Sequence, residues 1–141
     1  MAANKIMLLE PVALTTTTTT NIWSPPTLTG GTGVPDTGNA LTNVYYLIRQ
    51  IRVVNTTNTA IFVALWRAAT GANTAGKEFL WAGTATAGAL DANRGVSVPA
   101  NSFLNEFGAW RLDAGSTNKF IVGGASATGL TIMGWTEVGI D

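Results

Sequence analysis

The strongest constraint on the fold is the pattern from residue 44 onward, where short apolar runs alternate with clusters of Gly, Asn, Asp, Ser and Thr. No window of about 11 residues or more has the apolar spacing of an amphipathic helix. The strands expected are 45–54, 60–67, 78–86, 95–98, 107–112, 119–122 and 130–140. Helix is expected at most as a single turn, at 90–94 or 102–107. This pattern predicts an all-β fold, a jelly-roll-like β-sandwich of about eight short antiparallel strands.

Residues 1–43 follow a different pattern. They contain an apolar stretch from Ile6 to Leu14, a threonine run at 15–20 and a loop rich in Gly and Pro. Threonine and proline favour extended backbone over helix, so we expect an extended N-terminal arm and connector over 1–43 and a β-sandwich domain at 44–141. A flexible tail is the alternative, but large apolar side chains are costly to leave in water and should bind a partner surface. The expected arm anchors are Ile6, Leu8, Val12, Leu14 and Trp23.

Charged residues are scarce. Asp, Glu, Lys and Arg make up 11% of the 141 residues, with eight of each sign, so the net charge is zero. A typical soluble domain has about 25%, and a surface this poor in charge is prone to association. This composition favours a protein that is packed in an assembly, with a Thr- and Asn-rich extracellular β domain as the competing explanation. Because Lys and Arg form no cluster, neither nucleic acid nor a membrane is expected as a partner.

The apolar run near the N-terminus is too short for a signal peptide, and no apolar run reaches the length of about 18 residues that a membrane span needs. We therefore expect synthesis in the cytoplasm.

Histidine and cysteine are both absent. This removes the usual general base, the commonest metal ligand and any thiolate nucleophile. Most of the eight acids lie in expected turns or strand ends, which does not favour a catalytic carboxylate pair. The segment 91–93 comes nearest to a calcium loop and is read as a turn. Gly30, Gly31 and Gly33 are not followed by the lysine or helix of a phosphate loop. We expect no enzymatic activity, no cofactor and no metal.

Five tryptophans remain to be explained: Trp23, Trp66, Trp81, Trp110 and Trp135. Tryptophan within strands commonly packs in a core or anchors an interface, and stacking of sugar rings on exposed tryptophan is the alternative. Arginine within a strand can pair with a carboxylate of a neighbouring subunit. The residues expected at a subunit interface are Trp66, Trp81, Trp135, Arg52 and Arg67.

Three stretches carry a resemblance to known proteins, namely 51–67 (IRVVNTTNTAIFVALWR), 98–102 (VPANS) and the closing strand within 129–140. With the expected arm and the absence of His and Cys, they make the chain resemble small virion proteins of tailed bacteriophages, and more narrowly capsid decoration, or cement, proteins with a jelly-roll domain. The resemblance implies no catalytic motif. It implies homo-oligomers, most often trimers, on the capsid exterior of the virion after synthesis in the host bacterial cytoplasm. Their arms would reach across neighbouring copies of the major capsid protein.

Two other functions stay open. One is a different virion role, as a tail, collar or fibre-associated protein, which needs the same sandwich and the same associating surface. The other is a carbohydrate-binding β-sandwich module, for which oligosaccharides should quench the tryptophan fluorescence saturably.

Overall fold

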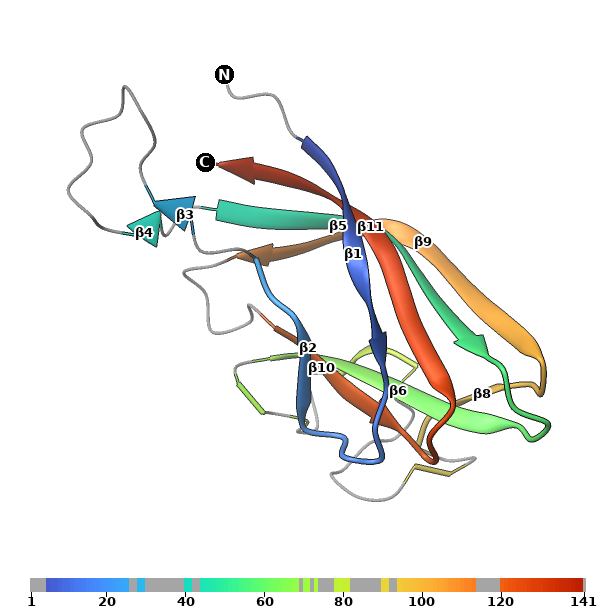
Figure 1. Ribbon diagram of the computed structural model, residues 1–141. Coiled ribbons are helices and arrows are strands. Elements are labelled where there is room, and N and C mark those ends of the chain that lie inside the picture. Colours follow the sequence, from blue (N-terminus) through green and yellow to red (C-terminus); the bar gives the residue numbers. More distant parts are fainter. Residues whose placement is uncertain are drawn as a thin grey trace.

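The computed structural model describes residues 5–25, 28–29, 40–41, 44–68, 70–71, 73, 78–81, 90–91, 94–113 and 120–140. These residues contain strands and no helix (Figure 1). The strands are β1 (Lys5–Ala13), β2 (Thr20–Trp23), β3 (Leu28–Thr29), β4 (Ala40–Leu41), β5 (Val44–Asn55), β6 (Ile61–Ala68), β7 (Glu78–Leu80), β8 (Val96–Val98), β9 (Ser102–Asp113), β10 (Phe120–Ala125) and β11 (Leu130–Ile140).

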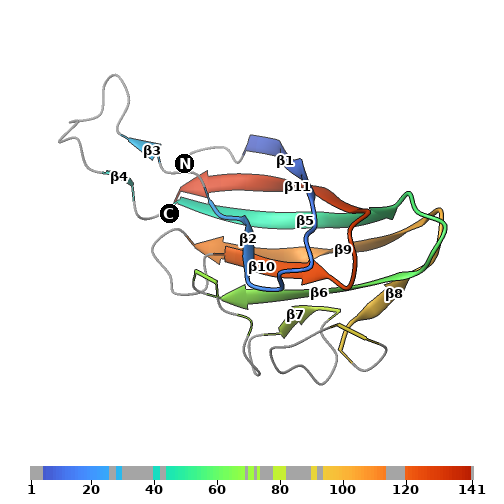
Figure 2. The ribbon, with the colours of Figure 1, turned by 60° about the horizontal axis from the view of Figure 1, so that its bottom comes forward.

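Nine of these strands form two antiparallel sheets. The first sheet has the order β1-β11-β5-β9, and the second has the order β2-β10-β6-β7, with β8 also paired to β6. Among the described residues, the short β3 and β4 pair only with each other. Figure 2 shows the second sheet on one side of the first. The all-β sandwich expected from the sequence is confirmed.

The sheets arise from nested pairing along the chain. When β3, β4 and β8 are set aside, the first of the remaining strands pairs with the last (β1 with β11), and β2 pairs with β10. Continuing inward, β5 pairs with β9 and β6 pairs with β7. The chain is thus one long antiparallel hairpin whose successive pairs fall in alternate sheets. Its N-terminal and C-terminal segments lie side by side.

The main core fills the space between the sheets. Strand β5 supplies Ile48, Ile51 and Val53 from one side, and β6 supplies Ile61 and Leu65 from the other, all of them buried. Side chains that alternate along a strand point to opposite faces of its sheet. Strand β6 is buried on both faces, because Trp66 and Ala64 pack with Leu90 in a second, smaller cluster on its far side.

The structure differs from the expected N-terminal arm. Strands β1 and β2 belong to the two sheets, and Leu9, Leu14 and Trp23 are buried in the main core. The threonine run carries the chain from the first sheet to the second, and its hydroxyl groups bond within the run, with Thr20 Oγ1 donating to the Thr17 carbonyl at 2.9 Å. The boundary expected at residue 43 is therefore wrong for residues 5–25, which are part of the sandwich. Of the Gly- and Pro-rich loop expected over 29–38, Thr29 belongs to β3, and residues 30–38 lie outside the described residues.

The single helical turn allowed at 102–107 is also wrong, because this segment is the first half of β9. Its register with β5 is regular from Ser102 to Phe107. A helical turn is also allowed by the sequence at 90–94, and residues 92–93 of that segment lie outside the described part of the chain.

Candidate interaction surface

The first sheet has one face on the core and one face turned away from the second sheet, which we call the outer face. On β5, Ile51 and Val53 point inward and are buried, whereas Arg52 and Val54 point outward and are half-buried. The cross-strand partners of these outward residues continue the face onto its neighbours: Arg52 lies opposite Met133 on β11 and opposite Asn105 on β9.

Large apolar side chains are exposed at both edges of the outer face. On β1, Ile6 is 74% exposed and Leu8 is 77% exposed, and Leu8 lies opposite Trp135 of β11. On β9, Phe103 is 49% exposed and Phe107 is 68% exposed. Exposed apolar side chains that gather on one face mark interaction surfaces, whereas scattered ones need no explanation.

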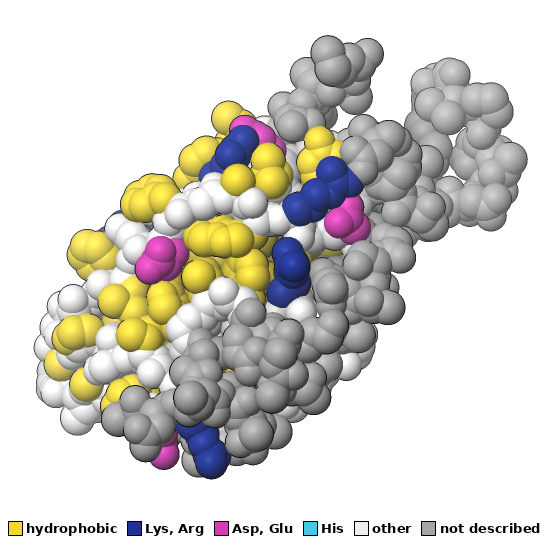
Figure 3. Space-filling view, turned by 180° about the vertical axis from the view of Figure 1, so that it is seen from behind, with side chains coloured by type: hydrophobic (Ala, Val, Ile, Leu, Met, Phe, Trp, Pro, Cys, Tyr) yellow, Lys and Arg dark blue, Asp and Glu magenta, His cyan; other side chains and the backbone are white. Residues whose placement is uncertain are grey.

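Half-buried apolar side chains join the two edges. Met133 and Trp135 of β11 and Leu47 and Val54 of β5 lie between the exposed residues of β1 and those of β9. On the side of the molecule seen from behind, hydrophobic side chains cover much of the described surface in view, and a few Lys, Arg, Asp and Glu side chains interrupt them (Figure 3). The scarcity of charge in the sequence is thus visible on the folded molecule.

The arginines of the outer face are held by intramolecular contacts. Arg49 Nη2 lies 3.1 Å from Glu137 Oε2 in a salt bridge. The guanidinium of Arg52 lies 4.2 Å from the centroid of the Phe103 ring, and that of Arg111 lies 4.0 Å from the Tyr45 ring. Such cation–π contacts place the guanidinium groups of Arg52 and Arg111 over aromatic rings of the same chain.

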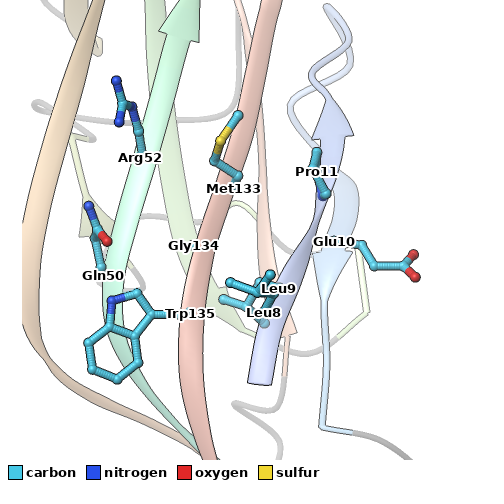
Figure 4. A pocket seen from close by; sticks show the side chains of 9 residues that line it. All are labelled: Leu8, Leu9, Glu10, Pro11, Gln50, Arg52, Met133, Gly134 and Trp135. Carbon is cyan, nitrogen blue, oxygen red and sulfur yellow. The ribbon is translucent and has the colours of Figure 1, made fainter. Parts of the chain in front are cut away.

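A hollow of about 460 Å³ crosses the outer face between β1 and β5 (Figure 4). The strand pairing is irregular beside it: the register of β1 with β11 shifts between Leu9 and Val12, and that of β11 with β5 shifts between Trp135 and Thr136. Figure 4 shows Gln50 and Arg52 of β5 and Trp135 of β11 on one side of it and Leu8 of β1 on the other. The lining residues are Leu8, Leu9, Glu10, Pro11, Gln50, Arg52, Met133, Gly134 and Trp135. This mostly apolar lining with few polar groups suits a protein side chain or an apolar ligand.

The structure separates the five expected arm anchors into two groups. Ile6 and Leu8 are exposed on the outer face. Leu14 and Trp23 are buried in the core of their own chain, and Val12 packs against that core. Trp23 Nε1 also donates a hydrogen bond of 3.2 Å to the Glu10 carbonyl, which ties β2 to β1. Only Ile6 and Leu8 are therefore available to a partner.

The expected interface residues do not form one surface. Trp66 is buried in the cluster behind β6, and its Nε1 has no hydrogen-bond partner among the described residues. Trp81 packs against the main core. Arg67 reaches across to the first sheet, where its Nη1 donates to the Arg111 carbonyl at 3.4 Å. Arg52 and Trp135 do lie together, at the hollow of the outer face.

None of the five tryptophans is exposed: Trp23 and Trp66 are buried, and Trp81, Trp110 and Trp135 are half-buried. Trp110 packs edge-on against Phe79, with ring centroids 5.4 Å apart. A sugar-stacking platform needs an exposed ring face, so these positions favour packing roles.

Two residues of the outer face were not expected from the sequence, namely Phe103 and Phe107. They alternate with Asn105 on one face of β9. The signal was the period-2 spacing of Phe103, Asn105 and Phe107, which indicates a strand once a helical turn is set aside.

The described residues contain no group of three or more Asp or Glu side chains that could hold a metal ion. Nor do they include a helix long and apolar enough to cross a membrane. Burial raises the pKa of the Tyr46 phenol above its ordinary value of 10.0.

Comparison with known proteins gave no relative: no family model matches the chain, and no curated protein or solved structure matches it.

Proposed function

We propose that the protein is a non-enzymatic virion structural protein that decorates and stabilises the icosahedral capsid of a tailed phage. It binds across neighbouring subunits of the major capsid protein on the capsid exterior. The observation that carries this proposal is the outer face of the first sheet, with exposed Ile6 and Leu8 at one edge and exposed Phe103 and Phe107 at the other. A band of this kind is costly in a free monomer and is covered in an assembly.

We further propose that the sandwich is a jelly roll. Jelly rolls have eight strands in two sheets, built from two Greek keys. The nested pairs β1–β11, β2–β10, β5–β9 and β6–β7 divide eight strands between two sheets, which supports this assignment. The resemblance of 51–67, 98–102 and 129–140 to capsid decoration proteins supports the phage assignment.

The binding mechanism follows from the position of the exposed residues. Ile6 and Leu8 are fixed on strand β1, so they bind as part of a preformed surface instead of as a flexible arm. A preformed surface loses less conformational entropy on binding than an arm that must be ordered. Many copies on one shell then give avidity without strong individual contacts.

The test is co-sedimentation with capsid shells of the phage that encodes the protein, assembled without it. The variant Ile6→Lys/Leu8→Lys places two charges on the exposed edge of β1, where neither side chain supports the core. We expect wild-type protein to saturate the shells at a stoichiometry set by capsid symmetry. We expect the variant to bind at least about tenfold more weakly, because two apolar contacts are lost and two charges are desolvated.

The control is Thr56→Lys/Ala60→Lys, which adds the same charge in the exposed turn between β5 and β6. This control should bind like the wild type. If wild-type protein does not bind the shells, the decoration function is wrong, and tail or collar components become the next partners to test. If both variants bind like wild type, the outer face is not the capsid-binding surface.

A further inference from the structure

The free edge of β9 differs from the other sheet edges. Unpaired edge strands invite association, and natural proteins protect them with proline, bulges, charge or short length. Strand β1 contains Pro11 and a register shift, β2 is four residues long, and β7 and β8 are three residues each. Strand β9 has 12 residues, and no strand in the described part of the chain pairs with its second edge.

The sequence of this edge is complementary to itself. From Ser102 to Phe107 the strand pairs regularly with β5, and the irregularity begins only after Phe107. This regular part carries the exposed Phe103 and Phe107, placed symmetrically on either side of Asn105 on the outer face. In an antiparallel pair of two such strands with Asn105 on the two-fold axis, Phe103 of each copy lies opposite Phe107 of the other.

This register lets the aromatic rings pack in pairs and brings no like charges together. Directly opposite residues in an antiparallel pair lie about 4.5–5.5 Å apart, close enough for aromatic pairs to stabilise the sheet. The only charged residue between 102 and 108 is Glu106, which falls opposite Leu104, so no like charges meet directly. Both exposed aromatic rings of β9 are covered at once.

We propose that two copies of the protein pair antiparallel through β9, with Asn105 on the two-fold axis, and join their first sheets into one continuous sheet. The partner that this edge fits is therefore a second copy of the chain. Such an isologous contact closes as a dimer, in place of the trimer that the phage resemblance implies. The pairing involves only the protein itself and does not depend on the proposed function.

The test uses single cysteines, since the native chain has none. Residues on the axis face their own copies at a distance within the range that a disulfide spans, about 4.4–6.8 Å between Cα atoms. We expect Asn105→Cys to form a disulfide-linked dimer in mild oxidant. Ala109→Cys is the matched control, because it is exposed on the same face of the same strand. In this register the two copies of residue 109 lie eight residues apart along the strand, about 26 Å.

The expected result is cross-linking of Asn105→Cys at least about tenfold faster than Ala109→Cys, because pairing raises the local concentration of only the axial thiols. The wild-type protein should have twice the chain mass of 14.7 kDa by light scattering. A monomer mass, a three-chain mass, or equal cross-linking of the two variants would overturn the pairing.

A second variant tests the aromatic contact. Phe107→Lys should weaken dimerisation by about tenfold or more, because it removes both reciprocal aromatic pairs. Its circular dichroism spectrum should stay that of the wild type, since Phe107 is exposed and does not support the core. Thr56→Lys should leave the dimer intact. A dimer unaffected by Phe107→Lys would show that the contact lies elsewhere.

Discussion

The backbone N–H of Leu14 donates a hydrogen bond of 2.9 Å to the carbonyl of Leu130. This bond joins the residue that follows β1 to the first residue of β11, and both side chains are buried in the main core. The N-terminal segment therefore closes the sandwich, and its apolar residues contribute to folding as well as to the surface.

Leu14→Ala should lower the free energy of unfolding by about 2–4 kcal/mol, because it removes a buried side chain and leaves a cavity. Leu8→Ala is the matched control and should change the free energy of unfolding by less than about 0.5 kcal/mol, since Leu8 is exposed. Urea denaturation followed by tryptophan fluorescence measures both. Equal effects of the two substitutions would contradict the placement of β1 in the sandwich.

The sequence predicted the central strands well and the N-terminal ones poorly. Strand β11 was expected at 130–140 and is Leu130–Ile140, because one face of it is buried and its apolar residues therefore alternate. Strand β5 was expected at 45–54 and spans Val44–Asn55. Strand β1 has an equally apolar sequence, but it pairs with β11, more than 100 residues away in the chain. Such a pairing leaves no local signal, so the sequence alone predicts an arm for this segment.

The candidate surface was predicted only in part for a related reason. Ile6, Leu8, Arg52 and Trp135 were expected to bind partners and do lie on the outer face. Their grouping follows from the strand order of the first sheet, which the sequence did not reveal. Trp66 was expected at an interface because aromatic residues suit both interfaces and cores. Its burial depends on the cluster with Leu90, which no local pattern indicates.

Asn55 organises the turn between β5 and β6 from a buried position. Its Nδ2 donates to the carbonyls of Thr59 (2.8 Å) and Val98 (3.0 Å), and its Oδ1 accepts from the N–H and hydroxyl of Thr57. Asn55→Ala should destabilise the protein by about 2–3 kcal/mol, because buried donors and acceptors lose their partner.

Asn58→Ala is the matched control for this substitution. Asn58 is exposed in the same turn and makes a single side-chain contact of 3.3 Å with Asn101, so a loss below about 0.5 kcal/mol is expected. Thermal unfolding measured by circular dichroism distinguishes the two variants. A small effect of Asn55→Ala would mean that water replaces its hydrogen bonds.

Gly124 fits closely under the threonine run. A Cβ atom at this position would lie 2.7 Å from the Thr17 carbonyl oxygen and 2.8 Å from that of Thr15. The Thr15 carbonyl also accepts a hydrogen bond of 2.9 Å from the Ala125 N–H. Gly124→Ala should therefore displace the connector and cost about 1–3 kcal/mol.

Thr128→Ala, at an exposed position in the following turn, should be nearly neutral in the same urea titration. If Gly124→Ala were as stable as the wild type, the threonine run would be able to move away from residue 124 without loss of stability. That outcome would contradict the close packing of Gly124 under the run, which the hydrogen bonds to Ala125 and within the run hold in place.

Tyr46 makes stability depend on alkaline pH. Burial raises the pKa of its phenol above 10.0, because the phenolate is poorly solvated in the core. The unfolded chain then releases this proton at a lower pH than the folded chain. The stabilisation is complete below about pH 10 and is lost as the pH rises through the folded-state pKa, with a slope of at most about 1.4 kcal/mol per pH unit.

Tyr46→Phe removes the ionisable group and keeps the buried ring, so the difference in unfolding free energy between wild type and variant should be constant from pH 7 to 9. Above about pH 10 the wild type should lose stability faster than Tyr46→Phe. Parallel curves over the whole range would mean that the phenol reaches solvent in the folded protein.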